Sequence, residues 1–263
     1  TGIMTGRSGN NIWCISPMFD INKPTILLNS HIDTVKPVSG WRKQPFTPKN
    51  ENGKLYGLGS NDAGASLVSL FQVYRHLSMT TQSYNLIFLA SCEEEVSGKN
   101  GIESVLPQLP PIALGVVGEP TEMQPAIAEK GLMVLDVTAR GKSGHAARNE
   151  GENAIYKLLP DIEWFRTYKF PKESPILGPV KMSVTQINAG TQHNVIPDLC
   201  SIVVDIRSNE CYSNEELFAE ICQHIQSEAK ARSFRLNSSS IPSDHPFVKR
   251  AIELGKVPFG SPT

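Results

Sequence analysis

Side chains that could bind a metal ion follow three short apolar segments of the chain. They are one histidine and several carboxylates: His31, Asp33, Glu93, Glu94, Glu95 and Glu119. Imidazole and carboxylate groups without thiolates form a ligand set for zinc, cobalt or manganese. A carboxylate that stays free of the metal can act as a base on metal-bound water. These residue types therefore indicate metal-assisted hydrolysis.

Each of these residues also has an ordinary structural explanation. A single histidine such as His31 is more often a satisfied, partly buried side chain, and Asp62 alone is a good helix N-cap. Three consecutive glutamates usually form a solvated loop, and Glu119 before Pro120 is typical of a turn. The metal-site interpretation depends on their common position after successive predicted strands.

The elements that would position these residues are strands of one sheet. The apolar segments 25–29, 84–90 and 112–117 are typical of buried strands. An amphipathic helix is predicted from Asp62 to Leu77, and a short helix over 102–109. Strands that alternate with helices predict a mostly parallel sheet covered on both faces, whose sites form outside the carboxyl ends of the strands. The histidine and the acids would meet at that edge.

The pattern changes near residue 125. Three further strands are predicted at 132–139, 180–187 and 202–206, and two helices at 153–167 and 214–231. Ser213 is a plausible N-cap of the second helix, with Glu216 at the capping-box position. This order predicts a small α+β unit over 128–239, inserted into a larger domain made of 1–127 and 240–263.

The composition is that of an ordinary soluble globular protein. The chain has 263 residues, of which 40% are hydrophobic and 19% charged. Its net charge of −1 gives no sign of a nucleic-acid or anionic-membrane partner. The five cysteines are odd in number and lack metal-type spacing, which favours a reducing cytoplasm. Cys14, Cys200 and Cys222 are expected in the core.

Four ordered segments resemble those of the M20 metallopeptidase family. They are Ser30-His31-Ile32-Asp33-Thr34-Val35, Gly57-Leu58-Gly59-Ser60-Asn61-Asp62-Ala63-Gly64, Glu93-Glu94-Glu95 and Gly118-Glu119-Pro120-Thr121. The resemblance covers nearly the whole chain and is strongest toward the acetylornithine deacetylase and succinyl-diaminopimelate desuccinylase branch. It implies an α/β fold: a mostly parallel-sheet zinc-peptidase catalytic domain with an inserted α+β lid/dimerisation domain.

The resemblance also implies two zinc ions per subunit, for which cobalt or manganese could substitute. His31, Asp62 and Glu119 would hold one zinc, and Asp62 would bridge to a second zinc held also by Glu95. The family's Glu-Glu pair is placed on residues 94 and 95 because 96–101 then aligns without a gap.

Three catalytic roles and two substrate contacts follow from the same resemblance. Glu94 would be the general base, and Asp33 would orient the metal-binding histidine. His145, in Gly141-Lys142-Ser143-Gly144-His145-Ala146, resembles a histidine that stabilises the oxyanion, often across the dimer. Asn194 and Arg207 resemble substrate-holding residues, and an arginine suits a carboxylate through a bidentate pair. Without the resemblance, His145 would be a polar loop histidine and Arg207 a surface ion pair.

Two further expectations concern the lid and the chain end. Glu129-Lys130-Gly131 resembles the segment that enters the lid, through which the family usually forms homodimers. The family's second zinc takes a histidine from near the C-terminus, and no match occurs before Thr263, because His245 lies too early. The chain is therefore expected to continue past Thr263.

The implied function is zinc-dependent deacylation of an N-acyl amino acid, with N-acetylornithine, and hence arginine biosynthesis, as the first expectation. The substrate would be a small molecule, with no nucleic-acid or membrane partner. The alternatives are a dipeptidase, tripeptidase or carboxypeptidase of the same family, and a metal-binding relative without hydrolytic activity.

Overall fold

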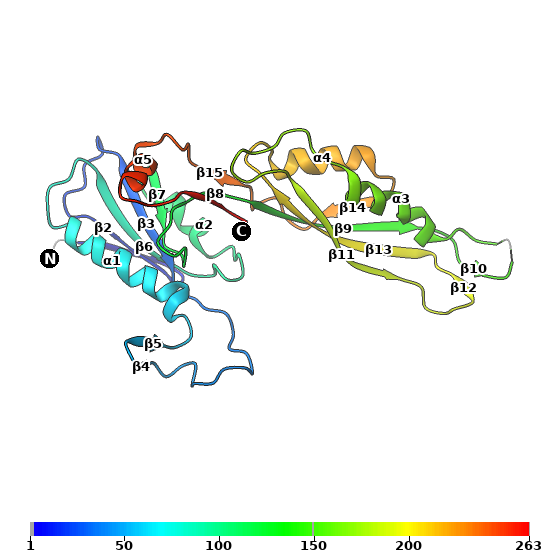
Figure 1. The fold of residues 1–263 in the computed structure, drawn as a ribbon, viewed down its shortest axis with the longest axis horizontal. Helices are drawn as coiled ribbons and strands as arrows, with labels where there is room; N and C mark the ends of the chain where they lie inside the picture. The colour runs from blue at the N-terminus through cyan, green and yellow to red at the C-terminus, as the bar shows by residue number, and fades with distance from the viewer. Residues whose placement is uncertain (1–2, 149, 263) are drawn as a thin grey trace. The chain divides into compact units, whose positions relative to one another are not determined.

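The computed structural model describes residues 3–148 and 150–262, and the chain divides into two compact units, Thr1–Glu122 and Met123–Thr263 (Figure 1). The first unit contains a five-stranded sheet in the order β1-β2-β6-β3-β7. Its strands are β1 (Met4–Ser8), β2 (Asn11–Ile15), β3 (Thr25–His31), β6 (Asn85–Ser91) and β7 (Leu114–Val117). β3, β6 and β7 run parallel, whereas β1 and β2 add an antiparallel edge. The predicted α/β class is confirmed.

Helices cover both faces of this sheet, as the alternation of strands and helices predicts. Successive strand residues point to opposite faces, so Leu28 packs with Tyr74 of α1 (Ser66–Leu77), whereas Leu27 packs with Val105 of α2 (Ile102–Val105). A short 3₁₀ turn, η2 (Leu106–Gln108), continues α2. Burial on both faces explains why β3 and β6 read as continuous apolar runs.

Two differences from the predicted elements lie near the strand ends. β3 extends two residues beyond its predicted end and includes His31. The helix predicted from Asp62 begins only at Ser66, because a π-helical segment, η1 (Ser60–Ala65), precedes it and Asp62 has non-helical backbone angles. Asp62 is therefore not the N-cap of α1.

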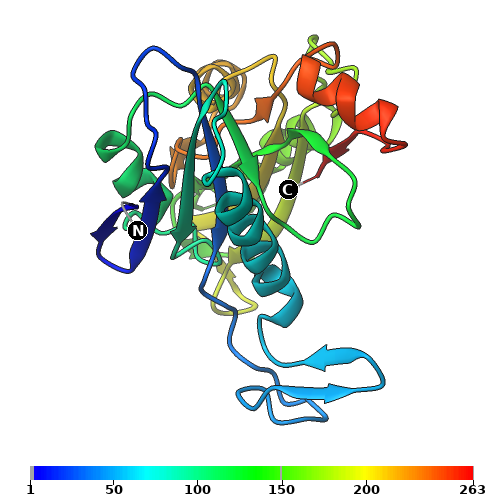
Figure 2. The same cartoon turned by 90° about the vertical axis from the view of Figure 1, so that its left-hand side faces the viewer.

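A hairpin that the sequence did not predict follows the first site residues. β4 (Lys49–Glu51) and β5 (Lys54–Tyr56) pair with each other, and the hairpin projects beyond the main sheet (Figure 2). Its two connecting residues, Asn52 and Gly53, have φ values of 51° and 74°. Asn-Gly is the preferred sequence for a two-residue turn with positive φ at both positions.

The second unit is built around a four-stranded antiparallel sheet in the order β11-β13-β9-β14. Its elements are β9 (Gly131–Arg140), α3 (Ala154–Thr167), β11 (Lys181–Ala189), β13 (Leu199–Ser208), α4 (Asn214–His224) and β14 (Glu228–Ala231). Both helices pack on the same face, and they form a core with alternate residues of the strands, such as Met133, Leu135 and Ile202. The other face carries polar and charged residues among apolar ones. The predicted α+β character is confirmed.

The second helix of this unit is shorter than predicted. The predicted capping box is present, because Ser213 and Glu216 exchange hydrogen bonds. However, α4 ends at His224, and the buried Asp161 carboxylate accepts the N–H groups of Gln226 and Ser227, both at 3.0 Å. The following residues alternate in exposure and form the edge strand β14. The prediction of helix up to residue 231 was wrong because those backbone groups have partners outside the helix.

Smaller elements complete the second unit. β8 (Ala126–Glu129) pairs with β15 (Ser239–Ser240) and with β16 (Phe259–Ser261), and α5 (Pro246–Glu253) lies between those two strands in the sequence. β10 (Gly144–His145) pairs with β12 (Val195–Ile196). The domain boundaries 1–127 with 240–263, and 128–239, stay a prediction.

Two findings bear on the expectations from composition. None of the helices within the described residues has the length and apolarity needed to span a bilayer. All five cysteines are unpaired, and Cys14 and Cys200 are partly or fully buried. Cys222 is exposed, so its predicted place in the core was wrong.

Candidate metal centre

Buried polar residues fix the carboxyl ends of the parallel strands against one another. The Ser30 hydroxyl donates a 2.8 Å hydrogen bond to the carbonyl of Gly118, and the Asn29 amide donates to the Ser91 hydroxyl at 3.0 Å. Asn29, Ser30 and Ser91 are all at most 5% exposed. No role was predicted for these three residues, although polar residues at the end of an apolar strand are a recognisable signal.

Two glycines shape the loop that presents Asp62. Gly59 has a φ of 74°, which disfavours other residues, and a Cβ there would lie 2.4 Å from the Thr34 methyl group. The Gly64 N–H donates to the Gly59 carbonyl at 2.9 Å, and a Cβ on Gly64 would lie 2.5 Å from that oxygen. This close approach turns the chain ahead of α1. The Asp62–Ala63 peptide is cis.

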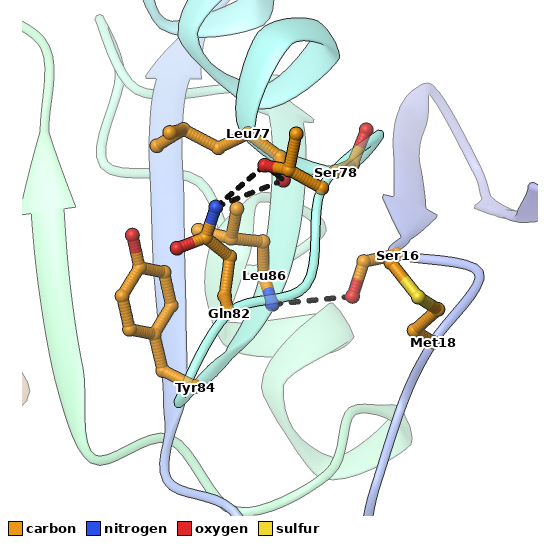
Figure 3. A pocket seen from close by; sticks show the side chains of 8 residues that line it. Ser16, Met18, Leu77, Ser78, Gln82, Tyr84 and Leu86 are labelled. Atoms are coloured by element: carbon orange, nitrogen blue, oxygen red, sulfur yellow. Dashed lines mark hydrogen bonds between the residues drawn. The ribbon is translucent and has the colours of Figure 1, made fainter.

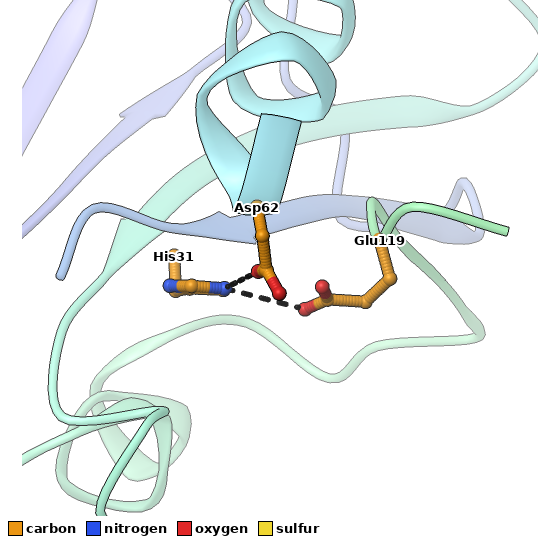
Figure 4. Close-up of side chains that lie close together, drawn as sticks. All are labelled: His31, Asp62 and Glu119. Carbon is orange, nitrogen blue, oxygen red and sulfur yellow. Dashed lines mark hydrogen bonds and ion pairs between the residues drawn. The ribbon is translucent and has the colours of Figure 1, made fainter. Parts of the chain in front are cut away.

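His31, Asp62 and Glu119 converge on one point (Figure 4). The His31 Nε2 atom lies 3.0 Å from Asp62 Oδ1 and 3.8 Å from Glu119 Oε1. One ligand atom from each of the three residues lies within 4.8 Å of the others. One ring nitrogen and two carboxylates are a donor set for a divalent cation such as zinc.

The other ring nitrogen of His31 is held by Asp33. His31 Nδ1 lies 2.9 Å from the Asp33 backbone carbonyl. A carbonyl oxygen can only accept, so Nδ1 must donate and a neutral ring has its lone pair on Nε2, facing the acids. The Asp33 carboxylate accepts the backbone N–H groups of Glu94 and Glu95 at 3.3 and 3.2 Å. Asp33 thus joins the histidine to the glutamate segment.

The three consecutive glutamates have three different environments. Glu93 accepts two hydrogen bonds from Asn100, at 3.1 and 3.0 Å, and faces its own loop. Glu94 Oε2 lies 4.0 Å from His31 Nε2, beside the candidate ligands. Glu95 Oε1 accepts the Val35 N–H at 3.2 Å, and Glu95 is outside the group of three candidate ligands.

Burial, together with the crowding of acids, shifts the pKa values of the site residues. Burial raises the pKa of Glu119 to about 7, and neighbouring carboxylates add to the rise while His31 opposes it. Burial also raises the pKa of Glu94. Burial lowers the pKa of His31, but the hydrogen bond to Asp33 and the nearby carboxylates outweigh it, so the net shift is upward. A cation placed among these groups would relieve the repulsion between the acids.

The remaining predicted site residues belong to the second unit. His145 is exposed in β10, and its Nδ1 accepts the Ala147 N–H at 3.2 Å. The Asn194 carbonyl accepts the Ala146 N–H at 2.9 Å, so the segments that carry His145 and Asn194 are neighbours. Arg207 in β13 donates from Nε and Nη2 to the Asp205 carboxylate, at 2.9 and 3.3 Å. One edge of its guanidinium group is therefore already paired.

A small hollow in the first unit lies at the opposite end of β6 from the candidate ligands. Ser16, Met18, Leu77, Gln82, Tyr84 and Leu86 line it, and the Leu86 N–H donates to the Ser16 hydroxyl at 3.3 Å (Figure 3). Its volume of about 10 Å³ holds at most one water molecule. It is too small for a substrate.

Known proteins similar to this chain include metal-binding peptidases and deacylases. Residues 127–233 match the family model described as the peptidase dimerisation domain of the M20 family. Acetylornithine deacetylase of Pectobacterium carotovorum is 30% identical over 252 residues, which are 88% of this chain and 65% of that protein. Succinyl-diaminopimelate desuccinylase of Pelagibacter ubique is 27% identical over 210 residues, 74% of this chain and 55% of that protein. The chain spans less than two-thirds of either relative.

Solved structures show the same fold. An M20 metallo-carboxypeptidase of Sulfolobus solfataricus superposes with a TM-score of 0.69, at 17% identity over 100% of this chain and 77% of that chain. The Bacillus subtilis YXEP protein, a dinuclear metal-binding peptidase, gives a TM-score of 0.64 at 16% identity, covering 99% of this chain and 73% of that chain.

An α/β sheet with a histidine and carboxylates at its strand ends and a separate α+β unit are thus the two parts of this chain. Residues 127–233 belong to the M20 peptidase dimerisation domain family, and the chain as a whole has the fold of an M20 metallo-carboxypeptidase.

Proposed function

We propose that this protein hydrolyses the amide bond of an N-acyl amino acid, and that N-acetylornithine is its first substrate to test. The observation that carries the proposal is the convergence of His31, Asp62 and Glu119, with the free carboxylate of Glu94 4.0 Å from the histidine. The similarity to acetylornithine deacetylase supports the choice of substrate. The corresponding role would be in arginine biosynthesis, in the cytoplasm.

The donor set fits zinc, with cobalt or manganese as substitutes. In this proposal His31, Asp62 and Glu119 hold one ion, and Asp62 and Glu95 contribute to a second. Glu95 would first have to release the Val35 N–H. A divalent cation held by these residues would polarise the acyl carbonyl and lower the pKa of the attacking water.

The chain's own residues supply the proton transfers and the positioning. Glu94 takes the proton of the attacking water and passes it to the leaving amine. Asp33 holds His31 in the tautomer that faces the acids, because its carbonyl accepts from Nδ1. Glu93 accepts hydrogen bonds from Asn100, and this supports the assignment of the general base to Glu94 and not to Glu93.

The second unit contributes substrate contacts in this proposal. His145 stabilises the oxyanion, a contribution typically worth about 3 kcal/mol. Asn194 and Arg207 hold the substrate, and residues 128–239 act as the lid that also forms a homodimer. The match of 127–233 to a peptidase dimerisation domain supports the last point.

A substrate panel tests the proposal. The zinc-loaded protein is expected to release ornithine from N-acetyl-L-ornithine, and N-acetylcitrulline, N-succinylornithine and N-succinyl-diaminopimelate complete the acyl series. Preferential cleavage of di- or tripeptides would instead favour the peptidase alternative, to which the fold shared with a metallo-carboxypeptidase lends support. Bound zinc without turnover of any of these compounds would support a non-catalytic relative.

A further inference from the structure

A fully buried asparagine, Asn11, begins the strand β2. Because β2 runs antiparallel to β6, with Ile12 opposite Ala90, the first residue of β2 lies beside the carboxyl end of β6. The three glutamates follow β6 at this same end. Asn11 is 0% exposed, and a polar side chain buried to that degree destabilises the fold unless it forms hydrogen bonds. Its amide group must therefore have partners inside the protein.

The Asn11 amide joins both ends of the loop 92–100, which carries Glu94. Its Oδ1 atom accepts the Cys92 N–H at 2.9 Å, and its Nδ2 atom donates to the Asn100 carbonyl at 2.7 Å. The Nδ2 atom also donates to the Ser8 carbonyl at 3.0 Å, in the turn between β1 and β2. One side chain from another strand thus holds the first and the last residue of the loop.

The two ends of the loop 92–100 also contact each other directly. The Cys92 thiol donates to the Asn100 carbonyl, with 3.6 Å between sulfur and oxygen. A Cβ atom on Gly101 would lie 2.5 Å from the Cys92 carbonyl oxygen, so this approach requires glycine. The ends of the loop are therefore packed as closely as the backbone allows.

Asp33 holds the middle of the same loop from the side of the candidate metal centre. Its carboxylate accepts the N–H groups of Glu94 and Glu95 at 3.3 and 3.2 Å. These distances lie at the long end of the range for N–H···O hydrogen bonds, and weaker bonds are expected there. The hydrogen bonds of the buried Asn11 amide are all shorter, so they restrain the loop more strongly.

We propose that Asn11 is a positioning residue for the general base: it fixes the ends of the loop 92–100, so that the Glu94 carboxylate stays beside His31. The Glu94 Oε2 atom lies 4.0 Å from His31 Nε2. A shift of about 1 Å in a catalytic group can lower a rate by about 10²-fold. This inference rests on the proposed function and deepens it, because it names the residue that holds the proposed base in place.

Asn11→Ala and Asn85→Ala form a matched pair of variants. Asn85 is 1% exposed at the opposite end of β6, and its amide group bonds to Asp20, Lys23 and Thr25. Both substitutions should lower the thermal midpoint to a similar extent. With saturating zinc, Asn11→Ala should lower kcat on N-acetyl-L-ornithine about 10- to 100-fold and keep KM within about 2-fold, because the proposed substrate contacts belong to the second unit. Asn85→Ala should keep both constants.

Hydrogen exchange, resolved to single amides, tests the positioning without turnover. The N–H groups of Glu94 and Glu95 bond to Asp33 and not to Asn11, so their exchange stays unchanged if Asn11 stabilises only β2. We expect both to exchange about 10-fold faster in Asn11→Ala, and at the wild-type rate in Asn85→Ala. Gly101→Ala separates the ends of the loop with Asn11 intact, and it should reproduce the faster exchange and the loss of kcat.

Two results in a folded Asn11→Ala protein would overturn the inference: an equal loss of kcat in Asn85→Ala, or unchanged exchange of the Glu94 and Glu95 amides. Should Asn11→Ala not fold, wild-type kcat and exchange in Gly101→Ala would overturn it as well. Faster exchange in Asn11→Ala without any hydrolysis by the wild type would instead overturn the proposed function and leave Asn11 as the residue that holds the loop. Circular dichroism verifies the folding of each variant.

Discussion

The three adjacent glutamates differ in their hydrogen-bond partners, and only one of them lies beside the candidate metal-binding histidine. Glu93 is tied to Asn100, Glu95 to the Val35 backbone, and Glu94 stands beside His31. The sequence predicted the identity of these residues from their place after a strand, together with the resemblance to a family. It could not show the two hydrogen bonds of Glu93, because they depend on how the loop 93–100 folds back on itself.

Glu94→Gln is expected to lower kcat on N-acetyl-L-ornithine by about 10²–10⁴-fold, because the amide cannot accept the proton of water. Zinc content, measured by mass spectrometry on the same sample, should remain that of the wild type. Glu93→Gln is the matched control and should keep kcat within a few-fold, since an amide oxygen can still accept from Asn100. Loss of zinc together with activity in Glu94→Gln would place Glu94 among the ligands and contradict its role as the base.

The side chain of Tyr168 should make the stability of the folded protein depend on pH. Its hydroxyl donates to Glu220, and this hydrogen bond, followed by burial, raises its pKa to about 12. The unfolded value is about 10, so the contribution to stability is present below pH 10 and is lost as the pH rises toward 12. Urea unfolding should therefore show stability falling over this range, and less steeply in Tyr168→Phe. In Tyr156→Phe, which removes the hydroxyl group of a 70% exposed side chain in α3, the wild-type slope should persist.

At the scale of elements, parallel strands explain why residues far apart in sequence meet. The paired strands β6, β3 and β7 end together, and the hydrogen bonds of Asn29 and Ser30 lock those ends. Apolar runs and helical periodicity were sufficient to predict these strands and α1. The end of α4 was missed because a tertiary partner, the Asp161 carboxylate, accepts the backbone N–H groups that follow it. The β4–β5 hairpin was missed although its Asn52-Gly53 turn is a local sequence signal.

A substitution in the loop before α1 tests whether this loop positions Asp62 for metal binding. Gly59→Ala places a methyl group at a φ of 74° and against Thr34, so we expect Asp62 to shift and zinc to bind about 10-fold more weakly. Gly9→Ala is a matched control, because its φ is 60° but its Cβ would meet nothing within 4 Å. Competition with a chromophoric chelator measures both affinities. Equal affinities in the two variants would show that the loop does not position Asp62 for the metal.

At the scale of the whole molecule, the chain joins two units of different construction. One is an α/β sheet with the candidate metal ligands at its strand ends, and the other is an antiparallel sheet with helices on one face. The two compact units are Thr1–Glu122 and Met123–Thr263, and the domain boundaries inferred from the change of pattern near residue 125 stay a prediction. The register of β11 against β13 could not be predicted from the sequence. Lys181 lies opposite Arg207, and the register shifts between Val184 and Gln186.

The zinc content of the wild type and of His31→Asn, measured beside turnover of N-acetyl-L-ornithine, tests the central claim most directly. The wild type should bind zinc and release ornithine, whereas His31→Asn should lose both zinc and activity, because it removes the only imidazole among the three ligands at a site where two acids repel each other. Unchanged zinc content in a folded His31→Asn protein would contradict the metal centre, and zinc binding by the wild type without deacylation would contradict the proposed reaction.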